Sequence, residues 1–154
     1  MTALLNVNGV EHAVAEDDAT SLLDILRETL QLKGTRFGCG SNQCGACMVL
    51  IDGAAVAACD TPLWAARGKK IITVEGLGEP TRPHPLQQAF LDEQAAQCGY
   101  CTSGMLIAAE ALLQRCAQPS EMQVRAALER NLCRCGSHNR ILRAVLRAAA
   151  SQHE

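Results

Sequence analysis

The chain has 154 residues with a formal net charge of −2 at pH 7, and only 3% of them are aromatic. No basic surplus favours nucleic acid, and no window approaches the ~20 apolar residues of a membrane-spanning helix. Large side chains are scarce, so we expect metal or disulfide cross-links to supplement the core.

The nine cysteines point to metal. The N-terminal stretch MTALLNVNGVEH has neither the basic region nor the long apolar run of a secretory signal. We therefore expect a cytoplasmic protein, with any membrane association made through a partner. Because structural disulfides are rare in a reducing cytosol, this many cysteines indicate metal ligands rather than disulfides.

The first half of the chain predicts β-strands. Residues 4–15 hold two short apolar runs around Asn8-Gly9, and residues 47–59 repeat this pattern around Asp52-Gly53. Both dipeptides are hairpin signals. Residues 69–77 predict one more strand.

A single helix is expected in this half, over residues 17–30. Thr20 or Ser21 can cap its N-terminus. Apolar side chains then recur at helical spacing, namely Leu22, Leu23, Ile25, Leu26 and Leu30.

A segment rich in proline and glycine, GLGEPTRPHP at 76–85, separates this half from the rest. Such a composition is typical of a linker, and we place the domain boundary at about 78–83. The predicted domains are therefore residues 1–78 and 79–154.

The second half predicts a small bundle of four helices. Pro85 suits the first turn of the first helix, and Thr102 or Ser103 can cap the second. Ser120 and Gln123 form a capping box for the third. The four helical segments are 85–97, 102–116, 119–132 and 139–152.

Four cysteines in the first half have the spacing C-x4-C-x2-C-x11-C, which is the plant-type spacing for a [2Fe–2S] cluster. The glycines at 38, 40 and 45 let the backbone wrap closely around an inorganic core. A structural zinc site is the alternative, although zinc usually combines C-x2-C with a second such pair or with histidines. The four cysteines are Cys39, Cys44, Cys47 and Cys59.

Four cysteines in the second half have the spacing C-x2-C-x31-C-x-C and lie at predicted helix ends. An antiparallel helix pair would bring these ends together. Zinc is a stronger rival here, and the C-x-C pair favours iron–sulfur. The four cysteines are Cys98, Cys101, Cys133 and Cys135.

The remaining candidate residues predict structural roles. Cys116, the ninth cysteine, ends an apolar helix stripe and is expected to be a buried small side chain. His12, His84, His138 and His153 are expected to be surface or structural residues, because no two of them accompany a cysteine pair as a Rieske centre requires. No catalytic residue is expected on this chain, since no triad, phosphate loop or carboxylate pair stands out.

Several motifs together resemble one family. The chain resembles the iron–sulfur subunits of the molybdenum hydroxylases, the xanthine dehydrogenase and aldehyde oxidase family, from about Leu4 to Ala149. The resemblance implies an α+β chain, with an N-terminal β-grasp domain of the 2Fe-2S ferredoxin type followed by an all-α four-helix-bundle domain that holds a second 2Fe-2S cluster. The motifs are GCGSNQCGACMVLIDG, ITVEGLG, HPLQQAF, QCGYCTSGM and NLCRCGSHNRI.

The resemblance also implies cofactors and partners. Gln97 and Cys135 match positions that contact a molybdopterin, expected as the cytosine dinucleotide, on a large subunit. Electrons would pass from molybdenum to the helical-domain cluster, then to the ferredoxin-domain cluster, and on to FAD or haem c of a flavin subunit or cytochrome c. An obligate, apolar interface with the large subunit is expected.

One departure from the family pattern is small. Ser41 and Asn42 stand where many relatives carry glycine, which keeps the cysteine loop short and polar, so the cluster prediction stands.

The substrate and the function class stay open from the sequence. The short stand-alone form is most similar to the branch that hydroxylates nicotinate, with isoquinoline or aldehydes as alternative substrates. A free-standing iron–sulfur carrier and a zinc-stapled interaction module are the competing functions.

Overall fold

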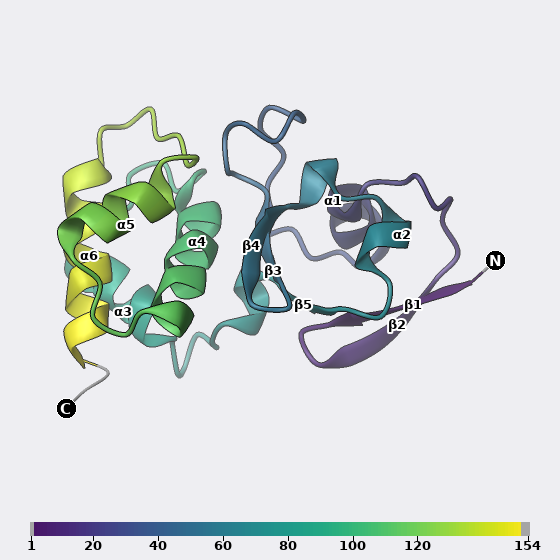
Figure 1. Cartoon of the computed structure of the whole chain (residues 1–154), viewed down its shortest axis with the longest axis horizontal. Helices are drawn as coiled ribbons and strands as arrows, with labels where there is room; N and C mark the ends of the chain where they lie inside the picture. Colours follow the sequence, from purple (N-terminus) through teal and green to yellow (C-terminus); the bar gives the residue numbers. More distant parts are fainter. Residues whose placement is uncertain (1, 152–154) are drawn as a thin grey trace.

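The computed structural model describes residues 2–151, and its N-terminal half is built on a mixed five-stranded sheet (Figure 1). The strand order is β2-β1-β5-β3-β4, in which β1 and β5 are parallel and the other neighbours antiparallel. The strands are β1 (Ala3–Val7), β2 (Val10–Val14), β3 (Met48–Ile51), β4 (Ala54–Ala57) and β5 (Lys70–Ile72).

Both predicted hairpins are confirmed. Asn8 and Gly9 join β1 to β2 with φ angles of 53° and 81°, and Asp52 and Gly53 join β3 to β4 with 51° and 83°. Two successive residues at positive φ suit the tight turns that match the twist of antiparallel strands. The strand expected at 69–77 is shorter than predicted, because a 3-10 turn, η3 (Val74–Gly76), follows it.

Short helices complete this domain. The predicted helix begins after Ser21, whose Oγ accepts the N–H of Asp24 at 3.1 Å. It comprises α1 (Leu22–Asp24) and a π-helical turn, η1 (Ile25–Thr29). Its buried apolar side chains are at most 1% exposed and pack with the sheet. Two further elements were not predicted, because they are too short to show a periodic pattern, namely α2 (Leu63–Ala66) and the 3-10 turn η2 (Ala58–Asp60).

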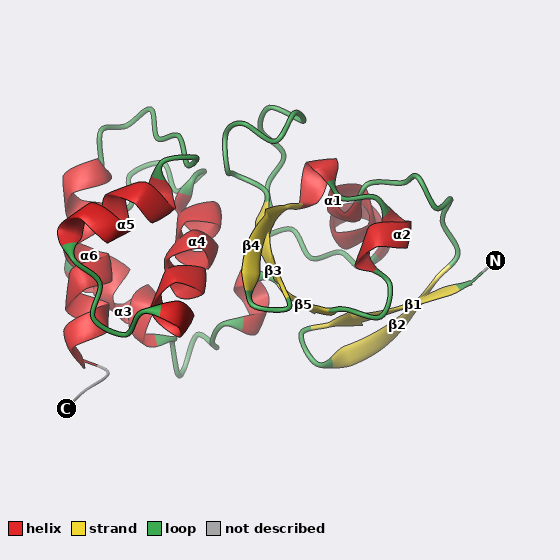
Figure 2. Ribbon diagram, viewed as in Figure 1, coloured by secondary structure: helices red, strands yellow, loops and turns green. Residues whose placement is uncertain are grey.

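Over residues 85–151 the only regular elements are helices, joined by loops (Figure 2). The capping box of Ser120 and Gln123 is confirmed, and Pro85 occupies the first turn as predicted. The predicted cap of the second helix is wrong, because that helix starts directly after Cys101 and already includes Thr102 and Ser103. The four helices are α3 (Pro85–Asp92), α4 (Thr102–Arg115), α5 (Glu121–Leu128) and α6 (His138–Ser151).

Helix α4 joins the two halves. It packs against α3 and α5 on one side and against β3 and β4 on the other. Ile107 and Ala111 of α4 accordingly belong to the core of the sheet domain, whereas Met105 and Ala109 belong to the helical core. The segment 78–83 forms a turn in which Glu79 and Arg82 exchange backbone hydrogen bonds. The domain boundary within it stays a prediction. No helix within residues 2–151 is long and apolar enough to cross a membrane.

Candidate metal centres

The first cysteine loop directs backbone N–H groups at sulfur. The amides of Ser41, Gln43 and Cys44 donate to Cys39 Sγ at 3.4, 3.3 and 3.3 Å. The amide of Cys39 donates in turn to Cys44 Sγ at 3.3 Å. Several N–H groups converging on one sulfur favour its thiolate form, so the loop already stabilises negative charge where a metal ligand needs it.

The thiols of this loop differ in acidity. Hydrogen bonds from the N–H groups of Ser41 and Gln43 lower the pKa of the Cys39 thiol to about 6. Burial raises the pKa of the Cys47 thiol to about 12. Cys39 therefore presents a thiolate at neutral pH, whereas Cys47 loses its proton only to a metal that replaces it.

Alkylation of the metal-free chain is expected to show this difference. The thiolate is the reactive form, and a lowered pKa keeps Cys39 in that form down to about pH 6. Its rate with iodoacetamide should reach half of its maximum near that pH, while Cys47 stays unmodified until the chain unfolds. Pulsed labelling followed by peptide mass mapping measures both. A half-maximum at about pH 8.5 for Cys39, the value of an ordinary free thiol, would contradict the proposed role of the loop.

Small residues leave room around these sulfurs. A Cβ atom on Gly38 would lie 2.5 Å from Cys44 Sγ, and Gly45 has φ of 71°. The thiols of Cys47 and Cys59 lie close enough to interact, since Cys59 is one of the groups that shift the pKa of Cys47. The four cysteines thus lie as two pairs, Cys39 with Cys44 and Cys47 with Cys59, which suits a cluster whose two irons each take two thiolates.

The second set assembles at helix ends, as the sequence predicted. Cys98 and Cys101 precede α4, and the other two lie between α5 and α6. Cys135 is close enough to affect the pKa of Cys98, and Cys133 is close enough to affect that of Cys101. The Tyr100 N–H lowers the pKa of Cys98, and burial raises that of Cys101 to about 12.

The eight thiols are grouped in pairs and are chemically free. All nine cysteines, each within the part of the chain that the structure describes, are outside disulfides. Over residues 2–151, no three His, Cys, Asp or Glu side chains gather closely enough to enclose a single metal ion. Two sets of four free thiols match the ligand set of two binuclear clusters, each of which takes four thiolates.

The two sets share one cavity of about 180 Å³. Cys44 of the first set and three cysteines of the second set line this cavity together, because the helical domain contacts the first cysteine loop. The N–H of Leu132, next to Cys133, donates to the carbonyl oxygen of Cys44 at 3.0 Å. The lining residues are Gly38, Cys44, Ala46, Cys98, Tyr100, Cys101, Leu132, Cys133 and Arg134.

Further polar contacts fix this arrangement, and sequence reasoning missed them. Asn131 is 4% exposed and donates to the carbonyl oxygen of Gly45 at 3.1 Å. The Tyr100 hydroxyl donates to the carbonyl oxygen of Phe37, and its ring stacks under Arg36 at 5.1 Å. Each hydrogen bond joins residues more than 60 positions apart, so no local pattern could reveal it.

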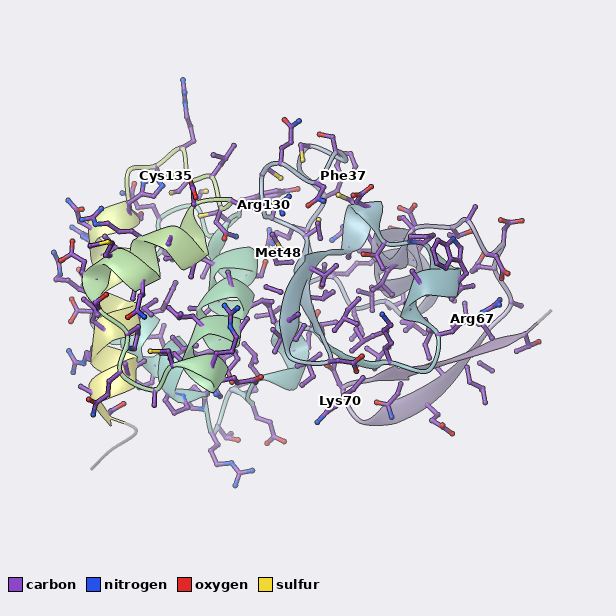
Figure 3. All side chains as sticks on the ribbon, viewed as in Figure 1. Phe37, Met48, Arg67, Lys70, Arg130 and Cys135 are labelled. Carbon is purple, nitrogen blue, oxygen red and sulfur yellow. The ribbon has the colours of Figure 1, made fainter. Side chains whose placement is uncertain are left out.

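The two residues expected near a pterin lie together. Gln97 Nε2 donates to the carbonyl oxygen of Cys135 at 2.9 Å. Gln97 is exposed and Cys135 is half-buried, and Figure 3 labels Cys135 in the helical domain. Contact with a pterin stays a prediction.

The other candidate residues have structural surroundings. Cys116 is half-buried against the helical core. His84 caps α3 and has Nε2 3.5 Å from Glu110 Oε2. His138 begins α6 and is exposed, His12 is half-buried on β2, and His153 lies outside the described residues. A larger cavity of about 580 Å³ at the linker has no cysteine in its lining.

Comparison with known proteins agrees with both centres. Residues 5–72 match the family model described as a 2Fe-2S iron-sulfur cluster binding domain, and residues 73–146 match the [2Fe-2S] binding domain. A nicotinate dehydrogenase subunit from Pseudomonas putida is 54% identical over 99% of this chain and 98% of that protein. The alpha subunit of isoquinoline 1-oxidoreductase from Brevundimonas diminuta is 47% identical over 95% of each chain.

A solved structure extends the likeness to the fold. Aldehyde oxidoreductase from Desulfovibrio gigas superposes with a TM-score of 0.95 at 40% identity, over 99% of this chain. The match spans only 17% of that longer chain. The arrangement of an N-terminal ferredoxin-like domain and a helical domain is therefore found both as a separate subunit and as part of a larger polypeptide.

Proposed function

Because the chain belongs to the family of small [2Fe–2S] subunits of molybdenum hydroxylases, we propose that it carries electrons away from the hydroxylation of nicotinate. Its class is shown by the relatives, and it is an electron-transfer subunit of a multi-subunit oxidoreductase. The choice of nicotinate is supported by the 54% identity to a nicotinate dehydrogenase subunit.

One observation carries the relay. Cysteines of both sets line a single cavity, and the Cys44 carbonyl oxygen accepts the N–H of the residue beside Cys133. When bound, the clusters accept and release one electron at a time. The chain itself supplies four thiolates to each cluster and N–H groups that stabilise the negative charge on sulfur. The proposed ligands are Cys39, Cys44, Cys47 and Cys59 for the outer cluster, and Cys98, Cys101, Cys133 and Cys135 for the inner one.

The direction of transfer follows from what surrounds each set. We place a molybdopterin of the large subunit beside Gln97 and Cys135, where the amide of Gln97 holds the Cys135 carbonyl. Beside the cavity between the two sets, Tyr100 and Leu132 expose 48% and 64% of their surface. Apolar side chains at this position fit a permanent partner interface. The outer set, with Cys39 exposed, faces the acceptor, for which a cytochrome c and a flavin subunit are the candidates.

Composition of the purified protein tests the proposal. Four iron and four sulfide per chain are expected, together with a large molybdenum-containing subunit that purifies with it and reduces both clusters when nicotinate is added. Two zinc ions in a colourless chain would overturn the iron–sulfur assignment. A coloured monomer that purifies without a partner would instead support a free-standing iron–sulfur carrier. Reduction of the clusters by isoquinoline or an aldehyde, and not by nicotinate, would change only the proposed substrate and would leave the electron-transfer role in place.

A further inference from the structure

In the loop proposed to bind the outer cluster, the backbone conformation of Asn42 orients the N–H groups that donate to Cys39 Sγ. Asn42 has φ of 57°, in the left-handed region that asparagine tolerates better than most residues. The amides on either side of it, from Ser41 and Gln43, both donate to Cys39 Sγ. A left-handed residue between such donors produces a concave anion site from successive N–H groups. Asn42 therefore shapes the donors around Cys39.

Arg130 binds the same peptide group from the other domain. Its Nη2 donates to the backbone carbonyl oxygen of Asn42 and, at 2.6 Å, to the side-chain Oδ1. The carbonyl of Asn42 and the N–H of Gln43 belong to one peptide unit. A cation on the oxygen of that unit polarises its N–H, which is the group 3.3 Å from Cys39 Sγ. Figure 3 shows Arg130 extending from the helical domain toward the loop that carries Phe37.

The charge of Arg130 is available for this role. Within residues 2–151 it forms no ion pair. The nearest acidic group in the network, Asp60, accepts from Asn42 Nδ2 at 3.0 Å and follows the ligand Cys59. Asn42 thus connects Arg130 to both segments that carry the outer ligands.

We propose that Arg130 is a positioning residue that raises the reduction potential of the outer cluster through the Asn42–Gln43 peptide group. The inference rests on the proposed function. A stronger N–H donor and a nearby cation both stabilise the extra negative charge of a reduced cluster, and such hydrogen bonds and charges set cluster potentials. The helical domain, which holds the inner cluster, thereby makes the outer cluster a better acceptor of its electron.

The test is a redox titration of the full chain with its co-purified large subunit, in which the paramagnetic signal of each cluster is followed separately. The outer signal is identified as the one that changes in Cys39→Ser. Arg130→Gln is expected to make reduction of the outer cluster about tenfold less favourable, which is a potential about 59 mV lower for one electron. The inner signal should keep its potential.

Two further variants separate charge from folding. Arg130→Lys retains the cation and should restore most of the potential. Arg125→Gln removes an arginine of α5 that pairs with Glu121, and it should leave both potentials unchanged. An outer potential that does not fall in Arg130→Gln, or a fall shared by both clusters, overturns the inference. Loss of iron from the unmodified chain would instead overturn the proposed function.

Discussion

Replacing Gly104 with alanine is expected to force the two domains apart and to empty the outer site. A Cβ atom at this position in α4 would lie 1.9 Å from the carbonyl oxygen of Gly45, and that oxygen is backbone. Gly45 has little room to move. Its carbonyl oxygen accepts a hydrogen bond from Asn131, and the backbone oxygen of Arg130 lies 2.6 Å from where a Cβ atom of Gly45 would be. The overlap is relieved only by displacing the loop between Cys44 and Cys47.

The expected loss is large for a one-atom change. Alanine in a helix gains about 1 kcal/mol over glycine, but overpacking costs about 3 kcal/mol, so the urea midpoint of unfolding should fall. Iron should drop from four to two per chain. Gly68→Ala is the control for strain without overlap: its added Cβ meets no atom within 4 Å, and because φ is 69° it should cost about 1 kcal/mol of stability while all four iron are kept. A Gly104→Ala chain with four iron and an unchanged midpoint would show that the contact is not needed.

Replacing Cys101 with alanine is expected to stop electron transfer altogether. Cys101 lines the shared cavity, and its thiol pairs with Cys133. Without it the inner cluster lacks one of four ligands and should be lost, which leaves two iron per chain. The outer cluster remains, but the substrate no longer reduces it, because the first step of the relay is missing.

Cys116 provides the control for that experiment. It is also a half-buried thiol of the helical domain, and it lies at the end of α4 outside both sets. Cys116→Ala should keep four iron and substrate-dependent reduction of both clusters. The two variants are compared by iron analysis and by the paramagnetic signals after addition of nicotinate. Equal iron content in the two variants would exclude Cys101 as a ligand.

Local sequence signals predicted the parts of this protein that are made locally. The hairpins at Asn8-Gly9 and Asp52-Gly53 and the capping box at Ser120 follow from backbone preferences of adjacent residues, and all are found. The start of α4 differs from the prediction: Thr102 and Ser103 look like caps, but both lie inside the helix, which begins directly after Cys101. Four-residue α2 carries too few residues for any periodic signal.

The cysteine spacings predicted how the thiols would group, but not how the two groups would face each other. That relation depends on Asn131, Tyr100 and Arg130, each of which contacts the first loop from more than 60 residues away. In the sequence, Asn42 differs from the glycine that many relatives carry, but the sequence does not show what its side chain contacts. Its positive φ explains why asparagine is accepted there, and its side chain gives it contacts that glycine could not make.

The two cysteine sets differ in how much of the chain each one requires, and this has a consequence for maturation in the cell. The first set is complete within residues 39–59, because three of its cysteines precede β3 and Cys59 lies in η2, directly after β4. The second set spans residues 98–135 and comes together only when α4 and α5 have docked. In the first case, iron and sulfide can bind to ligands that one short segment of the chain supplies. In the second case the ligands come together only after tertiary folding, and the proposed large subunit can bind beside Cys135 only after that step.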